Sequence, residues 1–103
     1  MQLVFQVLAD PTRRSILDLL TEGERAAGEI EGALGLTQPG TSKHLRVLRD
    51  AGLVTVRKDA QRRVYRLEPE GLREVLAWAE RYRRFQADHL VQLGDYLEGG
   101  STR

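Results

Sequence analysis

The hydrophobic pattern predicts two short helices at the start of the chain. Over residues 1–9, apolar side chains recur at helical spacing: Leu3, Val4, Val7 and Leu8. Asp10-Pro11 then marks a new start, because Asp can cap free N–H groups and proline suits the first helical turn. The second helix places its apolar residues at Ile16, Leu17, Leu19 and Leu20. The first helix is too short to bury its own apolar face, so it must pack on something else.

Residues 27–51 have the spacing of a helix-turn-helix. A short apolar third helix is predicted to stop at Gly35, although no Ser, Thr or Asp caps its start. Thr37 is placed to cap a fourth helix over residues 38–51, which Gly52 ends. That helix has two faces. One is expected in the core: Thr41, Leu45 and Leu48. The other faces outward: Gln38, Ser42, Arg46 and Arg49.

A β-hairpin is predicted over residues 53–68. Val54 and Val56 alternate with polar residues in its first strand, and a basic tip over residues 58–63 precedes a second strand around Tyr65. A helix-turn-helix followed by a hairpin is the order of a winged helix. The chain is therefore expected to be mainly α with a small β-hairpin, with residues 53–68 as the wing.

A long last helix is predicted over residues 70–97, with Trp78 and Phe85 adding aromatic bulk. It would be roughly 40 Å long, more than a globule of this size needs. Its surplus apolar face, like that of residues 1–9, predicts a homodimer. The contacts are expected at Leu3, Val4, Val7, Leu76, Ala79, Tyr82, Leu90, Leu93 and Leu97. The tail, 99–103, is predicted to be disordered.

Composition limits the function classes. With 103 residues, 41% of them hydrophobic, the chain suits one domain over 1–103. It has no cysteine, which excludes disulfides, thiolate metal sites and thiol nucleophiles. No apolar run reaches the roughly 20 residues of a membrane span, and the start lacks the pattern of a signal peptide. A cytoplasmic protein without a membrane partner is expected.

The charge is strongly divided along the chain, although the net charge is only +1. Residues 1–35 hold three arginines and six acids, whereas residues 36–66 hold eight basic residues and two acids. Residues 67–103 hold five arginines and seven acids. The basic block contains the fourth helix and the wing, which favours a polyanionic partner without proving one, since a basic segment is often only a solvated face.

The residue types suit double-stranded DNA. A helix fits the major groove, where Gln can address adenine and Arg or Lys can address guanine or phosphate. The candidates on the fourth helix are Thr37, Gln38, Ser42, Lys43, His44, Arg46 and Arg49, with His44 expected to contact backbone more than bases. The wing candidates, expected to grip phosphates, are Arg57, Lys58, Gln61, Arg62 and Arg63.

Three ordered motifs resemble the ArsR/SmtB family of dimeric bacterial winged-helix repressors. They are LADPTRRSILDLL at 8–20, SKHLRVLRDAGLV at 42–54 and RRVYRLEP at 62–69. The resemblance covers nearly the whole chain. It implies a homodimer built from the first and last helices, DNA recognition by the fourth helix, and repression at an operator.

The chain departs from that family in three ways. Gly40 and Thr41 stand where the family has a small helix former and an aliphatic residue, and Gln61 takes a glycine position in the wing. The third departure concerns metal sensing: the resemblance implies metal ligands either as cysteines on the third helix or as an Asp, His and Glu set on the last. Here the third helix has no thiol, and on the last helix the adjacent Asp88 and His89 point about 100° apart. We therefore predict no metal site and no cofactor. Members without metal ligands are the most similar in the last helix, and some regulate their own operon.

Other functions remain as alternatives on the residues alone. The polar face can instead serve a winged helix that binds a protein and no DNA. Trp78, Tyr82 and Phe85 can line a pocket for a small organic effector at the dimer interface, although no pattern identifies such a molecule. No set of nucleophile, base and orienting residue can be assembled, so no catalytic residue is predicted and the chain is not expected to be an enzyme.

Overall fold

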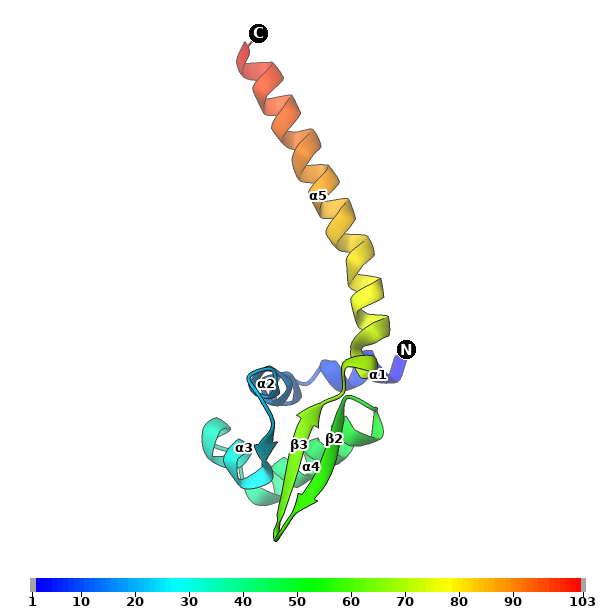
Figure 1. Cartoon of the computed structure of the whole chain (residues 1–103). Helices are drawn as coiled ribbons and strands as arrows, with labels where there is room; N and C mark the ends of the chain where they lie inside the picture. The colour runs from blue at the N-terminus through cyan, green and yellow to red at the C-terminus, as the bar shows by residue number, and fades with distance from the viewer. Residues whose placement is uncertain (1, 103) are drawn as a thin grey trace. The chain divides into compact units, whose positions relative to one another are not determined.

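The computed structural model describes the backbone of residues 2–102 and the side chains of residues 3–90. It divides into two units, residues 1–73 and the chain from residue 74 onward. The first unit contains four α-helices, three strands and a short 3-10 helix, and the second is a single helix (Figure 1). In the described part of the chain, no helix combines the length and apolar character that crossing a bilayer requires.

The first two helices are α1 (Gln2–Leu8) and α2 (Pro11–Leu20). The predicted cap at Asp10 is confirmed, because its carboxylate accepts hydrogen bonds from the backbone nitrogens of Thr12 at 2.8 Å and Arg13 at 3.1 Å. Two arginines of α2 in turn satisfy the free carbonyls that end α1. Arg13 Nε donates to the Val7 carbonyl and Arg14 Nη1 to the Leu8 carbonyl, both at 2.8 Å. Side-chain hydrogen bonds therefore hold α1 to the start of α2.

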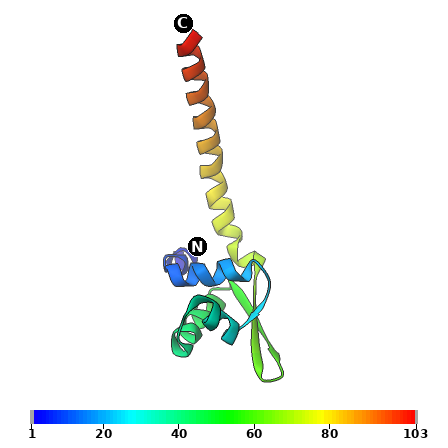
Figure 2. The same cartoon turned by 90° about the vertical axis from the view of Figure 1, so that its left-hand side faces the viewer.

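The predicted helix-turn-helix is formed by α3 (Ala27–Leu34) and α4 (Gln38–Asp50). Gly35 ends α3 in the left-handed conformation, with a φ of 65° that favours glycine. Thr37 caps α4 as expected, and its hydroxyl accepts a hydrogen bond from the Gly40 nitrogen at 3.1 Å. Figure 2 shows α2 crossing over α3 and α4, with the hairpin beside them.

The sheet has three antiparallel strands in the order β1-β3-β2, where the sequence predicts a two-stranded hairpin. The hairpin itself is β2 (Val54–Asp59) and β3 (Arg62–Leu67), and β1 (Arg25–Ala26) pairs with β3. Two residues cannot show the alternation that identifies a strand, which explains why β1 is not visible in the sequence. The hairpin turn is also tighter than the predicted basic tip, because Lys58, Asp59, Arg62 and Arg63 belong to the strands.

The core of the first unit draws on the helices and the sheet together. Its fully buried side chains are Ile16, Ile30, Thr41, Leu45, Leu48, Leu53 and Val54. The 3-10 helix η1 (Pro69–Leu72) follows the sheet and closes against the turn after α4. A Cβ atom on Gly71 would overlap the carbonyl oxygen of Gly52, so this approach requires glycine.

The second unit consists of α5 (Arg73–Thr102), whose first residue belongs to the other unit. The sequence predicts that this helix ends near Leu97 and that 99–103 are disordered, whereas the backbone is helical through Thr102. Glycine lowers helix propensity by about 1 kcal/mol relative to Ala but removes no backbone donor, so Gly99 and Gly100 do not force an end. Arg103 lies outside the described residues.

Candidate nucleic-acid interface

The helix α4 separates its residues into the two predicted faces. Thr41, Leu45 and Leu48 are at most 1% exposed and fix the helix to the core. The candidate residues of the other face are exposed: Gln38, Ser42, Lys43, Arg46 and Arg49. The buried face therefore holds α4 on the core while its polar face is exposed, which is the arrangement that a helix needs to contact bases in a DNA groove.

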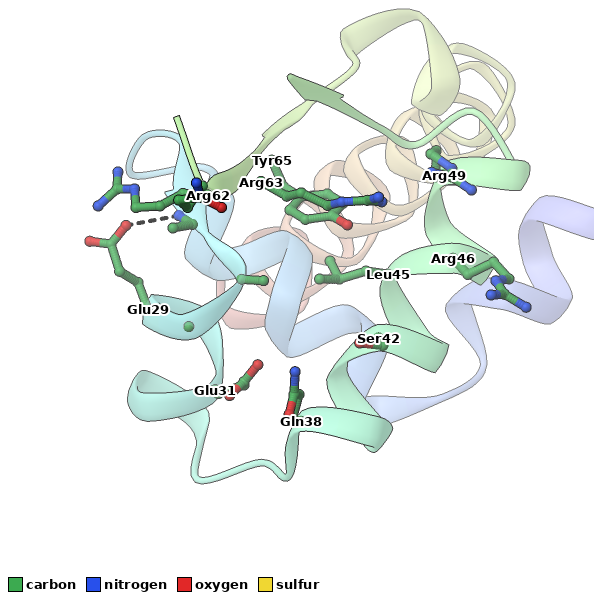
Figure 3. Close-up of a pocket in the computed structure, with 14 residues that line it drawn as sticks. Glu29, Glu31, Gln38, Ser42, Leu45, Arg46, Arg49, Arg62, Arg63 and Tyr65 are labelled. Carbon is green, nitrogen blue, oxygen red and sulfur yellow. Dashed lines mark hydrogen bonds between the residues drawn. The ribbon is translucent and has the colours of Figure 1, made fainter. Parts of the chain in front are cut away.

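A cleft of about 910 Å³ lies between the helix-turn-helix and the hairpin (Figure 3). The helix α4 contributes Gln38, Ser42, Leu45, Arg46 and Arg49 to its wall. The hairpin contributes Gln61, Arg62, Arg63 and Tyr65, and α3 with the residue before it contributes Ala26, Ala27, Gly28, Glu29 and Glu31. The cleft therefore brings together four arginines from two segments that are separate in the sequence, and it can hold a polyanion by charge.

The wing candidates do not all have the same surroundings. Gln61, Arg62 and Arg63 line the cleft, and Lys58 is exposed without a charged partner among the described residues. Arg57 instead points to the start of β1, where its Nη2 lies 2.5 Å from Oε1 of Glu24. Glu24 competes with DNA for this guanidinium, and the contact of Arg57 with DNA stays a prediction.

His44 lies half-buried on α4. Its Nδ1 is buried and has no hydrogen-bond partner within the described part of the chain. The backbone N–H of Arg13 is the main cause that lowers the pKa of Asp10, and the nearby charges of Arg13 and His44 lower it further. His44 therefore lies near the cap of α2, and its Nδ1 is not available to DNA.

The sequence does not reveal the positions of two side chains that line the cleft. The Glu29 carboxylate accepts a hydrogen bond from the Ala26 nitrogen at 2.8 Å, so it caps the start of α3 that lacks a Ser, Thr or Asp. A Glu three residues after a helix start is a known signal of this contact. Tyr65 is buried and lines the cleft, but its alternation pattern indicates only a core residue.

The predicted dimer contacts are mostly exposed in the single chain. Leu3, Leu76, Ala79, Tyr82 and Leu90 are exposed, and Val4 is half-buried against the core. Val7 is the exception, because it is 3% exposed and belongs to the core of its own chain. Its contact with a partner stays a prediction, and little of its side chain is left exposed for it. The side chains of Leu93 and Leu97 lie outside the described residues.

The helix α5 also carries aromatic side chains. The ring centroids of Trp78 and Tyr82 are 4.8 Å apart, and Phe85 stacks on His89 with centroids 6.0 Å apart. Over the described residues, no three His, Asp or Glu side chains come together in a group that could hold a metal ion. His89 takes part in an aromatic contact in this helix.

Comparison with known proteins places this geometry among transcription factors. A sequence model of the helix-turn-helix domain matches residues 8–57. The HTH-type transcriptional regulator Rv2034 of Mycobacterium tuberculosis is 42% identical over 98 residues, covering 95% of this chain and 91% of that protein. The transcriptional repressor SdpR of Bacillus subtilis is 36% identical over 75 residues, covering 73% of this chain and 83% of that protein.

A solved structure agrees with the sequence comparison. It is the homodimeric winged helix-turn-helix DNA-binding domain of Mb0332 from Mycobacterium bovis, described as a possible ArsR-family transcriptional regulator. The two chains are 34% identical with a TM-score of 0.67, and the match covers 81% of this chain and 77% of the other.

Proposed function

Because this chain belongs to the ArsR/SmtB family of winged helix-turn-helix transcriptional regulators, we propose that it represses transcription by binding operator DNA as a homodimer. The observation that carries the proposal is the cleft between α4 and the hairpin, which four arginines line. A bacterial regulator of this kind acts in the cytoplasm, where the chromosome lies.

In this proposal α4 enters the major groove. Gln38 addresses base edges, and Lys43, Arg46 and Arg49 contact guanine or phosphate. The exposed faces of these residues and the burial of Leu45 and Leu48 beneath them support that assignment. Ser42 and the backbone around it contact phosphate oxygens. Specificity then comes mainly from the helix.

The wing supplies electrostatic affinity. Lys58, Arg62 and Arg63 contact phosphates of a neighbouring groove, since their side chains are exposed on the hairpin. Contacts of this kind release counterions, so they strengthen binding to every sequence and weaken as salt rises. Arg57 contributes less to phosphate binding, because it forms an ion pair with Glu24.

Two copies of the chain read two half-sites about one turn of DNA apart. The exposed apolar side chains of α1 and α5 support a dimer contact through these helices: Leu3, Leu76, Tyr82 and Leu90. The gene that encodes the chain is proposed as one of its targets. Release of DNA does not require a metal ion in this scheme, and zinc, copper or cadmium is expected to leave DNA affinity unchanged.

Fluorescence anisotropy tests the proposal directly. The intact protein is titrated into its own upstream DNA and into a scrambled duplex of equal length, each at several salt concentrations. We expect preference for the upstream DNA and a steep loss of affinity as salt rises. Weak and equal binding to both duplexes would contradict autoregulation. Selection from a random duplex library then decides whether another operator exists, and failure to enrich any sequence would reject sequence-specific binding.

A further inference from the structure

We propose that Glu31 of α3 is a specificity determinant, and that its carboxylate accepts a hydrogen bond from the exocyclic amino group of a base, cytosine N4 in the first place. The proposal rests on the DNA-binding function proposed above and deepens it. It adds a residue from the first helix of the helix-turn-helix to a reading surface otherwise assigned to the second.

Glu31 lies within the same cleft as the basic side chains. It is half-buried, and it lines the cleft together with Gln38 of α4. Figure 3 shows the two side chains near each other in this view of the cleft. A base that Gln38 can address therefore lies next to a base that Glu31 can address.

Glu31 has no structural contact like that of the nearby acid Glu29. The carboxylate of Glu29, two residues earlier in α3, accepts a hydrogen bond from the Ala26 N–H and caps the helix. The Glu31 carboxylate makes no hydrogen bond or ion pair with any residue in the part of the chain that the structure describes. Its polar atoms are therefore available to a ligand in the cleft.

A carboxylate at this place has a definite chemical preference. It repels phosphate, so it opposes the affinity that Arg46, Arg49 and Arg63 provide. An ionised carboxylate only accepts hydrogen bonds, and in the major groove cytosine presents an amino group whereas guanine presents two acceptors. Every base pair carries one amino group in the major groove, so what matters is whether that group lies on the base that faces Glu31. A cytosine there satisfies the carboxylate, whereas a guanine leaves a desolvated charge facing acceptors, which disfavours that sequence.

Two substitutions separate hydrogen bonding from charge. Glu31→Ala and Glu31→Gln both remove one negative charge, but only Gln keeps an acceptor oxygen. Asp18→Asn removes the same charge from an exposed position of α2 outside the cleft and serves as the matched control. The operator is first found by selection from random duplexes with the wild-type protein. Dissociation constants are then measured for a panel in which each base pair of a half-site is changed in turn.

We expect Glu31→Ala to lose about tenfold discrimination at one base pair of each half-site, next to the pair that Gln38→Ala affects. Glu31→Gln should retain part of that discrimination, and Asp18→Asn should retain all of it. An equal gain in affinity of both Glu31 variants for every duplex, with unchanged preferences, would overturn the proposal and leave only a charge effect. A wild-type protein that selects no sequence would instead reject the proposed function, and this inference with it.

Discussion

Arg57 of β2 and Glu24, which precedes β1, form an ion pair that joins the hairpin to the short edge strand, with Nη2 and Oε1 2.5 Å apart. The hydrogen bond from Arg57 is the main cause that lowers the pKa of the Glu24 carboxyl, and the same bond raises the pKa of Arg57. Both groups are thus charged at neutral pH. Arg57 also lies 3.9 Å from Asp59, so two acids surround it.

This pairing predicts that neighbouring basic residues of the wing differ in their effect on DNA binding. Lys58→Ala should reduce the salt dependence of binding by about one unit, because one phosphate contact is lost. Arg57→Ala should reduce it by less. Glu24→Gln should increase both affinity and salt dependence, because it releases Arg57 for a phosphate. Anisotropy titrations over a salt series measure these slopes, and equal losses for Arg57→Ala and Lys58→Ala would show that the pair does not restrain Arg57.

The cap of α2 predicts an acid-dependent loss of stability. The Arg13 N–H is the main cause that lowers the pKa of Asp10 from its usual 3.8. The folded state therefore favours the ionised carboxylate, and its stabilisation is full above the unfolded pKa and is lost as the pH falls through the folded pKa. Urea unfolding of the wild type and Asp10→Asn, between about pH 6 and pH 2, should show a smaller pH dependence in the variant. Parallel curves would exclude this role of Asp10.

Two glycine substitutions should have opposite effects on stability. Gly71→Ala should destabilise by about 1–3 kcal/mol, because the new Cβ atom would overlap the Gly52 carbonyl. Gly32→Ala lies in α3 with no atom within 4 Å of the new Cβ and should stabilise by about 1 kcal/mol. Denaturant midpoints of both variants check the prediction. A neutral Gly71→Ala would mean that η1 moves away from the turn at little energetic cost.

The start of α4 predicts coupling between Thr37 and Gly40. A Cβ atom on Gly40 would lie 2.9 Å from the capping hydroxyl of Thr37, which must then shift. In the wild type, the gain in helix propensity of Gly40→Ala, about 1 kcal/mol, should therefore be offset by a weaker cap. In a Thr37→Ala background the same change should stabilise. A double-mutant cycle measures the coupling, and additive effects would show that the cap accommodates Ala.

The exposed apolar side chains of α5 predict where the dimer can be broken. Leu90→Asp should dissociate the dimer, because a charge would have to be buried in the contact. Arg81→Asp serves as the control, since nine residues at about 100° each place it on the opposite side of the helix. Sedimentation velocity distinguishes the species. A Leu90→Asp protein that remains dimeric would remove this face of α5 from the interface.

Local signals in the sequence predict much of the fold. Asp10-Pro11 and Thr37 identify two helix starts because capping depends on neighbours within three residues. The faces of α4 follow from its 3.6-residue period, so the burial of Leu45 and Leu48 is also predicted correctly. The winged-helix order follows from these elements.

Features that depend on distant partners are not predictable in the same way. Arg57 is a basic residue of the wing, which favours a DNA contact. Its ion pair with Glu24 is not visible in the sequence, because Glu24 lies 33 residues earlier in the chain. Val7 is predicted to contact a partner copy, yet it is buried in the core of its own chain, where Arg13 and Arg14 hold the end of α1. The need for glycine at position 71 arises only when η1 meets the turn at Gly52.

The strand order β1-β3-β2 leaves β2 at an edge of the sheet, and no other strand pairs with its outer side in the described residues. Unpaired edges of this kind invite strands of other molecules and lead to aggregation, which natural proteins prevent with charged side chains. The second half of β2 is Arg57-Lys58-Asp59, and all three side chains are charged. These charges, which include the proposed phosphate contact of Lys58, also protect the edge from pairing with a strand of another molecule. Neutral substitutions of Arg57 and Lys58 are therefore expected to reduce solubility, and that of Lys58 is expected to reduce DNA affinity as well.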